Sequence, residues 1–162
     1  MKKNSLLLFF IFVGFTGKAQ NIPTWKIEDV ANYYTKANDS IYVINFWATF
    51  CKPCIGEIPY LESISKKYER QKVKLLLVSL DLPAFYPDNI RRFAQKNNYT
   101  SDIAWLNETD VNHFCPLISK KWTGSIPATV IVNAATGYRF FIESVMSEKQ
   151  FENELKKAFG NK

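Results

Sequence analysis

Two cysteines separated by two residues are the part of this chain whose chemistry is easiest to infer. Cys51 and Cys54 enclose Lys52-Pro53, at the point where a dense apolar run ends and a helical pattern begins. Residues three apart in the first turn of a helix place their Cβ atoms about 5–6 Å apart, close to what a disulfide requires. The pair can therefore close a small ring and open it again, as thiol–disulfide exchange requires.

The position of Cys51 predicts that it is the nucleophile. The first N–H groups of a helix have no partner within the helix, and together with the helix dipole they stabilise a thiolate. Pro53 removes no hydrogen bond there, because its missing N–H would have had no partner. We therefore expect Cys51 to attack a substrate disulfide and Cys54 to resolve the mixed disulfide that forms.

Other interpretations of the cysteines fit the sequence less well. A zinc site needs four ligands, and beyond the pair the chain offers Cys115 and its single histidine, His113, at poor spacing. Haem attachment needs a histidine after the second cysteine, where this chain has Ile55. A structural disulfide stays open as an alternative, although it does not explain Pro53. Cys115 is expected to be a buried free thiol, His113 a surface residue, and no metal or organic cofactor is expected.

The N-terminus has the pattern of an export signal. Lys2 and Lys3 precede an apolar stretch over residues 6–15, and Gly17-Lys18-Ala19 supplies small residues for signal peptidase. We expect residues 1–19 to be cleaved, leaving residues 20–162 as one exported or periplasmic domain with no stable membrane span. The alternative is an uncleaved membrane anchor, but a spanning helix needs about 20 apolar residues.

Composition predicts one globular domain that does not bind nucleic acid. The 162 residues are 47% hydrophobic and 22% charged, which provides apolar material for a core. Cleavage after Ala19 would remove three lysines and no acid, lowering the formal net charge from +6 to +3. The remaining basic residues are scattered in pairs, so they do not form the patch that nucleic-acid binding requires.

Apolar patterning predicts the elements that position the cysteines. β-branched and aromatic residues fill 41–47, as in a strand buried on both faces, and a helix follows over 52–70 with a kink at Pro59. The buried strand over 73–80 should be a parallel neighbour of the first, because strand–helix–strand units cross over right-handed. The other expected elements are a helix capped by Thr24 (24–36), a helix capped by Asp88 (88–97), a strand (103–106), a helix that begins at Thr109 or Asp110 and reaches about residue 121, a hairpin (128–133 and 138–142) and a terminal helix capped by Ser147. From residue 41 the order is β-α-β-α-β-α-β-β-α, an α/β fold with a mixed central sheet flanked by helices.

Two stretches resemble the thioredoxin superfamily, and its exported TlpA/ResA-like branch in particular. They are Asn45–Pro59 around the cysteines and Lys121–Thr129. The resemblance covers about residues 24–160 and implies a thioredoxin fold with an inserted strand–helix segment at about residues 82–106. It also implies reduction of disulfides in other exported proteins, with electrons from a membrane thiol donor, and leaves open whether the substrate is apocytochrome c or another exported thiol protein. A disulfide-donating oxidase or isomerase and a redox-inert binding module are the alternatives.

The resemblance also implies a substrate-binding surface beside the cysteines. Pro127 would follow a cis peptide bond and face the pair, and Ile126 before it would offer backbone groups to an extended substrate segment. Phe50 replaces the tryptophan usual before the first cysteine, which keeps an apolar platform but removes the indole N–H.

A possible proton acceptor lies one helical turn after the pair. Asn45 stands where cytoplasmic thioredoxins keep a buried aspartate, and the resemblance makes Glu57 the substitute. If burial raises the pKa of Glu57, its carboxylate can take the proton from Cys54 during resolution. The alternative is an ordinary solvated glutamate on the helix surface.

Overall fold

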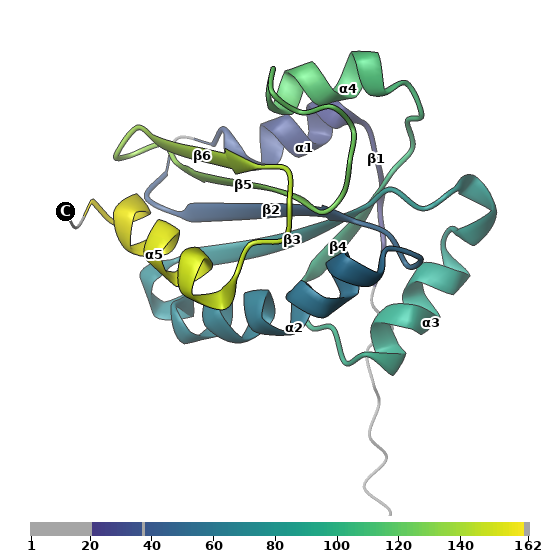
Figure 1. Cartoon of the computed structure of the whole chain (residues 1–162), viewed down its shortest axis with the longest axis horizontal. Helices are drawn as coiled ribbons and strands as arrows, with labels where there is room; N and C mark the ends of the chain where they lie inside the picture. Colours follow the sequence, from purple (N-terminus) through teal and green to yellow (C-terminus); the bar gives the residue numbers. More distant parts are fainter. Residues whose placement is uncertain (1–20, 37, 161–162) are drawn as a thin grey trace, which may run out of the picture.

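A six-stranded sheet forms the centre of the protein, and its strands run in the order β1-β4-β3-β2-β5-β6 (Figure 1). The computed structural model describes residues 21–36 and 38–160, so the expected signal peptide at residues 1–19 lies outside the described residues. The elements are β1 (Thr24–Trp25), α1 (Ile27–Tyr34), β2 (Ile41–Trp47), α2 (Lys52–Lys67), η1 (Glu69–Gln71), β3 (Val73–Ser79), η2 (Pro83–Phe85), α3 (Asp88–Lys96), β4 (Asp102–Leu106), α4 (Val111–Ile118), β5 (Ala128–Asn133), β6 (Tyr138–Ile142) and α5 (Glu148–Ala158).

Strand β2 is buried along its whole length because helices cover both faces of the sheet. Phe46 packs with α1 and α4 on one face, and Trp47 packs with α2, α3 and α5 on the other. Successive residues of a strand point to opposite faces, so a strand covered on both sides shows no apolar–polar alternation. This explains the unbroken apolar run over 41–47.

Strand pairing brings distant segments together at one end of the sheet. Strand β2 is parallel to β3 and antiparallel to β5, with Trp47 opposite Ser79 and Phe46 opposite Ala128. The ends of β2, β3 and β4 therefore meet the beginning of β5, and we call this the carboxyl end of the sheet. At the amino end, β3 begins at Val73 and β4 at Asp102.

The predicted α/β fold, a mixed sheet flanked by helices, is confirmed. The strands at 41–47, 128–133 and 138–142 have the predicted bounds, and the predicted parallel pairing of β2 with β3 is present. The segment expected as an insertion forms η2, α3 and β4, and β4 lies between β1 and β3. Among the described residues, no helix is both long and apolar enough to cross a membrane.

The predicted helix over 24–36 is wrong at its beginning. Thr24 and Trp25 form the edge strand β1, in which Thr24 pairs with Trp105 in parallel. Helix α1 begins only at Ile27, after its N-cap Lys26. A two-residue strand is too short to show a periodicity of its own, and its pairing partner lies far along the chain.

Several predicted helix ends also needed correction. Helix α2 stops at Lys67 before η1, and the N-cap of α3 is Pro87 rather than Asp88. Helix α4 stops at Ile118, because Ser119 has extended backbone angles, φ −158° and ψ 131°. The cap of α5 is as predicted, since the Ser147 side chain accepts a hydrogen bond from the backbone N–H of Gln150.

Candidate active site

Cys51 and Cys54 form a disulfide at the amino terminus of α2. Cys51 is the N-cap of the helix and Cys54 lies in its first turn, with the two Cα atoms 5.3 Å apart. The Cys51 side chain is 8% exposed and Cys54 is 0% exposed. The backbone N–H of Cys54 donates to Cys51 Sγ at 3.3 Å, so a helix N–H already points at this sulfur. The sulfur nearer the surface is therefore the one that the helix amino terminus can stabilise as a thiolate.

The loop before β5 lies against the disulfide. Its Ile126–Pro127 peptide bond is cis, and Cys51 Sγ lies 3.8 Å from the Ile126 carbonyl oxygen. Antiparallel pairing of β5 with β2 places this loop at the carboxyl end of the sheet, where α2 begins. The expected cis bond and its position beside Cys51 are thus present, and substrate binding by Ile126 stays a prediction.

An exposed aromatic ring flanks the pair. Phe50, directly before Cys51, has 63% of its surface exposed. Its position beside Cys51 fits the apolar platform that was expected, and contact with a substrate stays a prediction. Its neighbour Thr49 is tied to Asp81 after β3, a buried residue that the sequence reasoning missed. The available signal was an aspartate directly following a predicted buried strand.

Glu57 is buried beneath the pair, one helical turn after Cys54. Its side chain is 0% exposed, which excludes the solvated alternative. Asn45 Nδ2 donates to one carboxylate oxygen at 2.7 Å, and the backbone N–H of Met146 donates to the other at 3.0 Å. Burial raises the pKa of Glu57 above its ordinary value, while these two hydrogen bonds oppose the rise. The bonds recorded for this carboxylate do not include Cys54, so proton transfer from that thiol stays a prediction.

Asn45 links this carboxylate to the strand that follows the cis-proline loop. The Asn45 amide also donates to Thr129 Oγ1 at 2.9 Å, so it bridges β2, α2 and β5. A neutral amide here holds the Glu57 carboxylate in place without cancelling its charge. When this carboxylate is ionised, dipoles rather than a cation of the described residues stabilise its charge.

The third cysteine, Cys115, and the single histidine, His113, lie outside the disulfide site. Cys115 is a buried free thiol, as expected, and burial together with the charge of Glu143 raises its pKa to about 11. His113 is exposed, as expected, and its Nε2 lies 3.6 Å from a carboxylate oxygen of Glu28. A cation could be contacted here by His113, Glu28 and Glu108, because one ligand atom from each lies within 4.8 Å of the others. His113 and Glu28 are exposed and Glu108 is partly buried.

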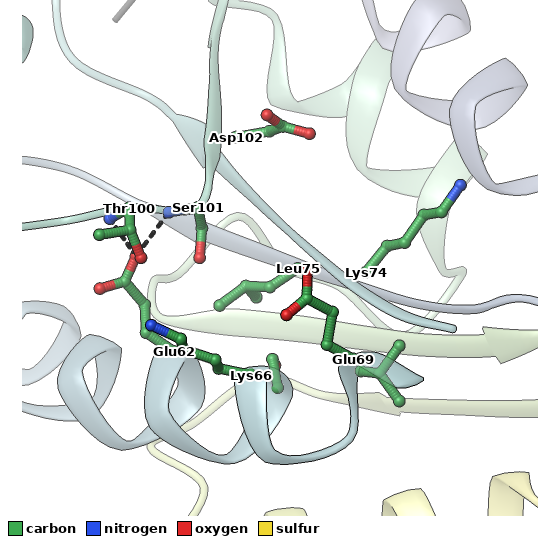
Figure 2. Close-up of a pocket in the computed structure, with 10 residues that line it drawn as sticks. Glu62, Lys66, Glu69, Lys74, Leu75, Thr100, Ser101 and Asp102 are labelled. Atoms are coloured by element: carbon green, nitrogen blue, oxygen red, sulfur yellow. Dashed lines mark hydrogen bonds between the residues drawn. The ribbon is translucent and has the colours of Figure 1, made fainter. Parts of the chain in front are cut away.

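An open cavity of about 370 Å³ lies at the amino end of the sheet, where β3 and β4 begin. Figure 2 shows residues that line it. Glu62 of α2 accepts hydrogen bonds there from the backbone N–H groups of Thr100 and Ser101, at 2.6 and 2.7 Å. Charged side chains of both signs line the cavity, namely Glu62, Lys66, Glu69, Lys74 and Asp102. None of the lining residues is a cysteine, so this cavity takes no part in the disulfide site.

Comparisons with known proteins agree with this geometry. The AhpC/TSA family matches residues 12–137. The thiol-disulfide oxidoreductase ResA of Geobacillus thermodenitrificans is 26% identical over 69% of this chain and 59% of its own length. The thioredoxin-like protein YneN of Bacillus subtilis is 23% identical over 92% of this chain and 94% of its own length. The chain thus spans less than two thirds of that ResA but nearly all of YneN.

Solved structures share the arrangement of the sheet and helices. A thioredoxin-related protein from Neisseria meningitidis serogroup B superposes with a TM-score of 0.65 at 25% identity, over 78% of this chain and 90% of that one. A secreted disulfide oxidoreductase of Mycobacterium tuberculosis superposes with a TM-score of 0.56 at 19% identity, over 76% of this chain and 85% of that one. The fold is therefore the thioredoxin fold.

Proposed function

The chain belongs to the AhpC/TSA family, and on that premise we propose that it is a thiol–disulfide oxidoreductase acting through Cys51 and Cys54. The observation that carries the proposal is the disulfide at the amino terminus of α2, with Cys51 Sγ 3.8 Å from the carbonyl oxygen that precedes cis-Pro127. A substrate segment bound along this loop would bring its own sulfur to Cys51 rather than to the fully buried Cys54. The name of the ResA relative supports the same activity.

The exchange takes place in two steps. In the reduced protein, the Cys51 thiolate attacks one sulfur of a substrate disulfide, that S–S bond breaks, and the released substrate thiolate takes up a proton. Cys54 then loses its proton and attacks Cys51 Sγ, which releases the second substrate thiolate and forms the Cys51–Cys54 bond seen here. The substrate gains two electrons and the protein loses two, so a dithiol donor must reduce the protein again.

Glu57 is the proposed proton acceptor for the second step. Cys54 and Glu57 are both fully buried and lie one turn apart on α2, where side chains three residues apart share a face. Burial raises the pKa of Glu57, which brings its basicity closer to what proton transfer at neutral pH needs. The hydrogen bonds from Asn45 and Met146 hold the carboxylate in one orientation.

We further propose that exchange runs in the reducing direction, on disulfides of other exported proteins. The export-signal pattern at residues 1–19 and the resemblance to the ResA-like branch support this, and a membrane thiol donor would supply the electrons. A strong oxidant needs a very stable thiolate at Cys51. Lys52 favours that thiolate, but the Lys52 side chain is exposed and solvent screens it, whereas the Glu57 carboxylate is buried near the pair. A disulfide-donating oxidase or isomerase is the second candidate, because Lys52 favours it.

A trapping experiment tests the activity. A Cys54→Ser variant, mixed with an oxidised peptide that holds one disulfide, should accumulate a mixed disulfide on Cys51, because nothing resolves it. The matched control, Cys51→Ser, should form no such adduct because Cys54 is buried. Equal yields of the adduct in the two variants, or no adduct in either variant, would contradict the proposal. Mass spectrometry under non-reducing conditions identifies the bonded cysteine.

A further inference from the structure

Asp81, two residues after the end of β3, has a carboxylate that is buried and accepts several hydrogen bonds. The residue is 3% exposed. Its carboxylate accepts from the backbone N–H of Thr49 at 3.1 Å, from Thr49 Oγ1 at 2.5 Å and from Ser79 Oγ at 2.7 Å. Both oxygens of the carboxylate act as acceptors in these bonds. Two of the three donors belong to the segment that leads to Cys51.

The backbone of Asp81 is itself held in place. Trp105 Nε1 of β4 donates to the Asp81 carbonyl oxygen at 2.8 Å. The preceding N–H, of Leu80, donates to the carbonyl oxygen of Trp47 at the end of β2, also at 2.8 Å. Asp81 is therefore fixed to both neighbouring strands and can act as a rigid support for the loop that it contacts.

The supported loop carries the reactive sulfur. Residues 48–51 join β2 to α2 and contain Phe50 and Cys51. Within the loop, the N–H of Cys51 donates to the Ala48 carbonyl oxygen at 3.0 Å, and Thr49 makes the bonds to Asp81. The Cys51–Cys54 bond also restrains this loop, but only in the oxidised protein. After reduction the disulfide no longer restrains the loop, so its position depends more on the hydrogen bonds to Asp81.

Because the Asp81 carboxylate is buried, its stability depends on the hydrogen bonds from the loop of residues 48–51, and the same bonds hold the loop in position. Among residues 21–36 and 38–160, no ion pair includes Asp81, so dipoles alone stabilise its charge. A buried charge that loses its hydrogen bonds is strongly destabilised, and bonds to an ionised acceptor are about twice as strong as neutral ones. Moving Thr49 away would remove two of the three donor groups that bond the carboxylate, its backbone N–H and its hydroxyl, so the loop is held in position.

We propose that Asp81 is a positioning residue for Cys51, holding residues 48–51 so that the Cys51 sulfur stays opposite the Ile126 carbonyl oxygen when the disulfide is open. This rests on the thiol–disulfide exchange proposed above. Asp81 acts through Thr49 and does not touch the substrate. Misplacing a reacting group by about 1 Å can reduce a rate by about a hundredfold, so loss of this support should slow the attack by Cys51.

Two substitutions at Asp81 separate positioning from charge. Asp81→Asn keeps an oxygen that can accept from Thr49 and an amide that can donate to Ser79 Oγ, whereas Asp81→Ala keeps neither. Both variants lack the negative charge, so the difference between them reports on the hydrogen bonds. The matched control is Glu62→Ala, which removes a carboxylate that also accepts backbone N–H bonds, but at the amino end of the sheet.

The measurement is the rate at which Cys51 attacks an oxidised peptide, per folded molecule, in a Cys54→Ser background. We expect Asp81→Ala to slow this attack by about ten- to a hundredfold, Asp81→Asn to restore most of the rate, and Glu62→Ala to match the parent. Denaturant unfolding gives the folded fraction of each protein. If Asp81→Ala does not fold, Thr49→Val removes one donor and should cause a smaller loss. A full rate in Asp81→Ala, or in Thr49→Val where Asp81→Ala does not fold, would overturn the proposal.

A second readout does not depend on enzymatic activity. Amide hydrogen exchange over residues 48–51 in the reduced protein should be slow in the parent and clearly faster in Asp81→Ala, because the Thr49 N–H loses its acceptor. Equal exchange in the two proteins would overturn the role of Asp81. If the parent itself fails to attack the peptide, the proposed function fails, while hydrogen exchange still decides whether Asp81 holds the loop.

Discussion

The two ends of the central sheet both carry acidic side chains, but in different surroundings. At the carboxyl end, Glu57 and Asp81 are buried and bonded to backbone N–H, amide or hydroxyl groups. At the amino end, Glu62 and Glu69 line an open cavity of about 370 Å³ that also holds two lysines (Figure 2). Water and opposite charges weaken electrostatic effects there. The cavity at the amino end has space for a ligand, whereas the carboxyl end has the Cys51–Cys54 disulfide with two buried carboxylates near it.

The largest difference that we expect between substitutions at the two ends of the sheet is in the rate of disulfide reduction. Cys51→Ser should reduce the activity to the uncatalysed background, because a serine hydroxyl does not ionise at neutral pH and cannot form the mixed disulfide. Glu69→Gln at the amino end should leave activity unchanged. Reduction of an oxidised peptide, followed by its free thiols, measures both. Residual activity in Cys51→Ser would contradict the assignment of the nucleophile.

Glu57→Gln should slow resolution by Cys54 while the protein stays folded. A well-placed general base contributes about 10²- to 10⁴-fold, so release of a preformed Cys51 mixed disulfide should slow within that range at neutral pH. Glu62→Gln, a neutralised glutamate of the same helix at the other end of the sheet, is the matched control. If both variants release the peptide as fast as the parent, Glu57 is not the base.

The reactivity of the free thiol, Cys115, can be compared with that of Cys51 in the same reduced molecule. Burial and Glu143 raise the pKa of Cys115 to about 11, from an ordinary value of 9.0, so its thiolate is about a hundredfold scarcer at neutral pH. In the reduced protein, iodoacetamide should therefore modify Cys51 at least about a hundredfold faster than Cys115. Peptide mapping by mass spectrometry gives both rates, and equal rates would refute the burial of Cys115.

Much of this arrangement can be predicted from sequence because its signals are local. The run over 41–47, the cysteine spacing and the cap at Ser147 each depend on neighbouring residues, and each prediction agrees with the structure. The edge strand β1 could not be predicted, because it has two residues and its pairing partner Trp105 lies far along the chain.

The polar contacts of the site are harder to predict for the same reason. Glu57 is bonded to Met146, 89 residues away, and Asp81 to Thr49, 32 residues away. No local periodicity links such pairs. The resemblance of two motifs to a known branch identified Glu57, Ile126 and Pro127, but Asp81 lies outside both motifs and became visible only through its hydrogen bonds.

The smallest expected effect is a pH dependence of stability that comes from Glu57. Burial raises its pKa in the folded protein, so between the ordinary value of 4.5 and the folded value the folded state binds more protons than the unfolded state. This contribution to stability is complete below the ordinary value and is lost as pH rises through the folded pKa. The slope approaches about 1.4 kcal/mol per pH unit for one proton.

Urea unfolding of the oxidised protein across this pH range measures that slope. Glu57→Gln cannot ionise and should lack this part of the pH dependence, whereas Glu62→Gln should keep it. The same pH dependence in Glu57→Gln and in the parent would show that Glu57 does not titrate differently in the folded state.

The reduction potential of the Cys51–Cys54 pair tests the central proposal most directly. Equilibration with glutathione buffers, followed by mass analysis of alkylated protein, gives this potential. We predict a value close to the roughly −270 mV of thioredoxin, as expected for a pair that reduces substrates. A value near the roughly −120 mV of a strong oxidant would contradict the reducing direction, and one well below about −300 mV would show a structural bridge that takes no part in exchange.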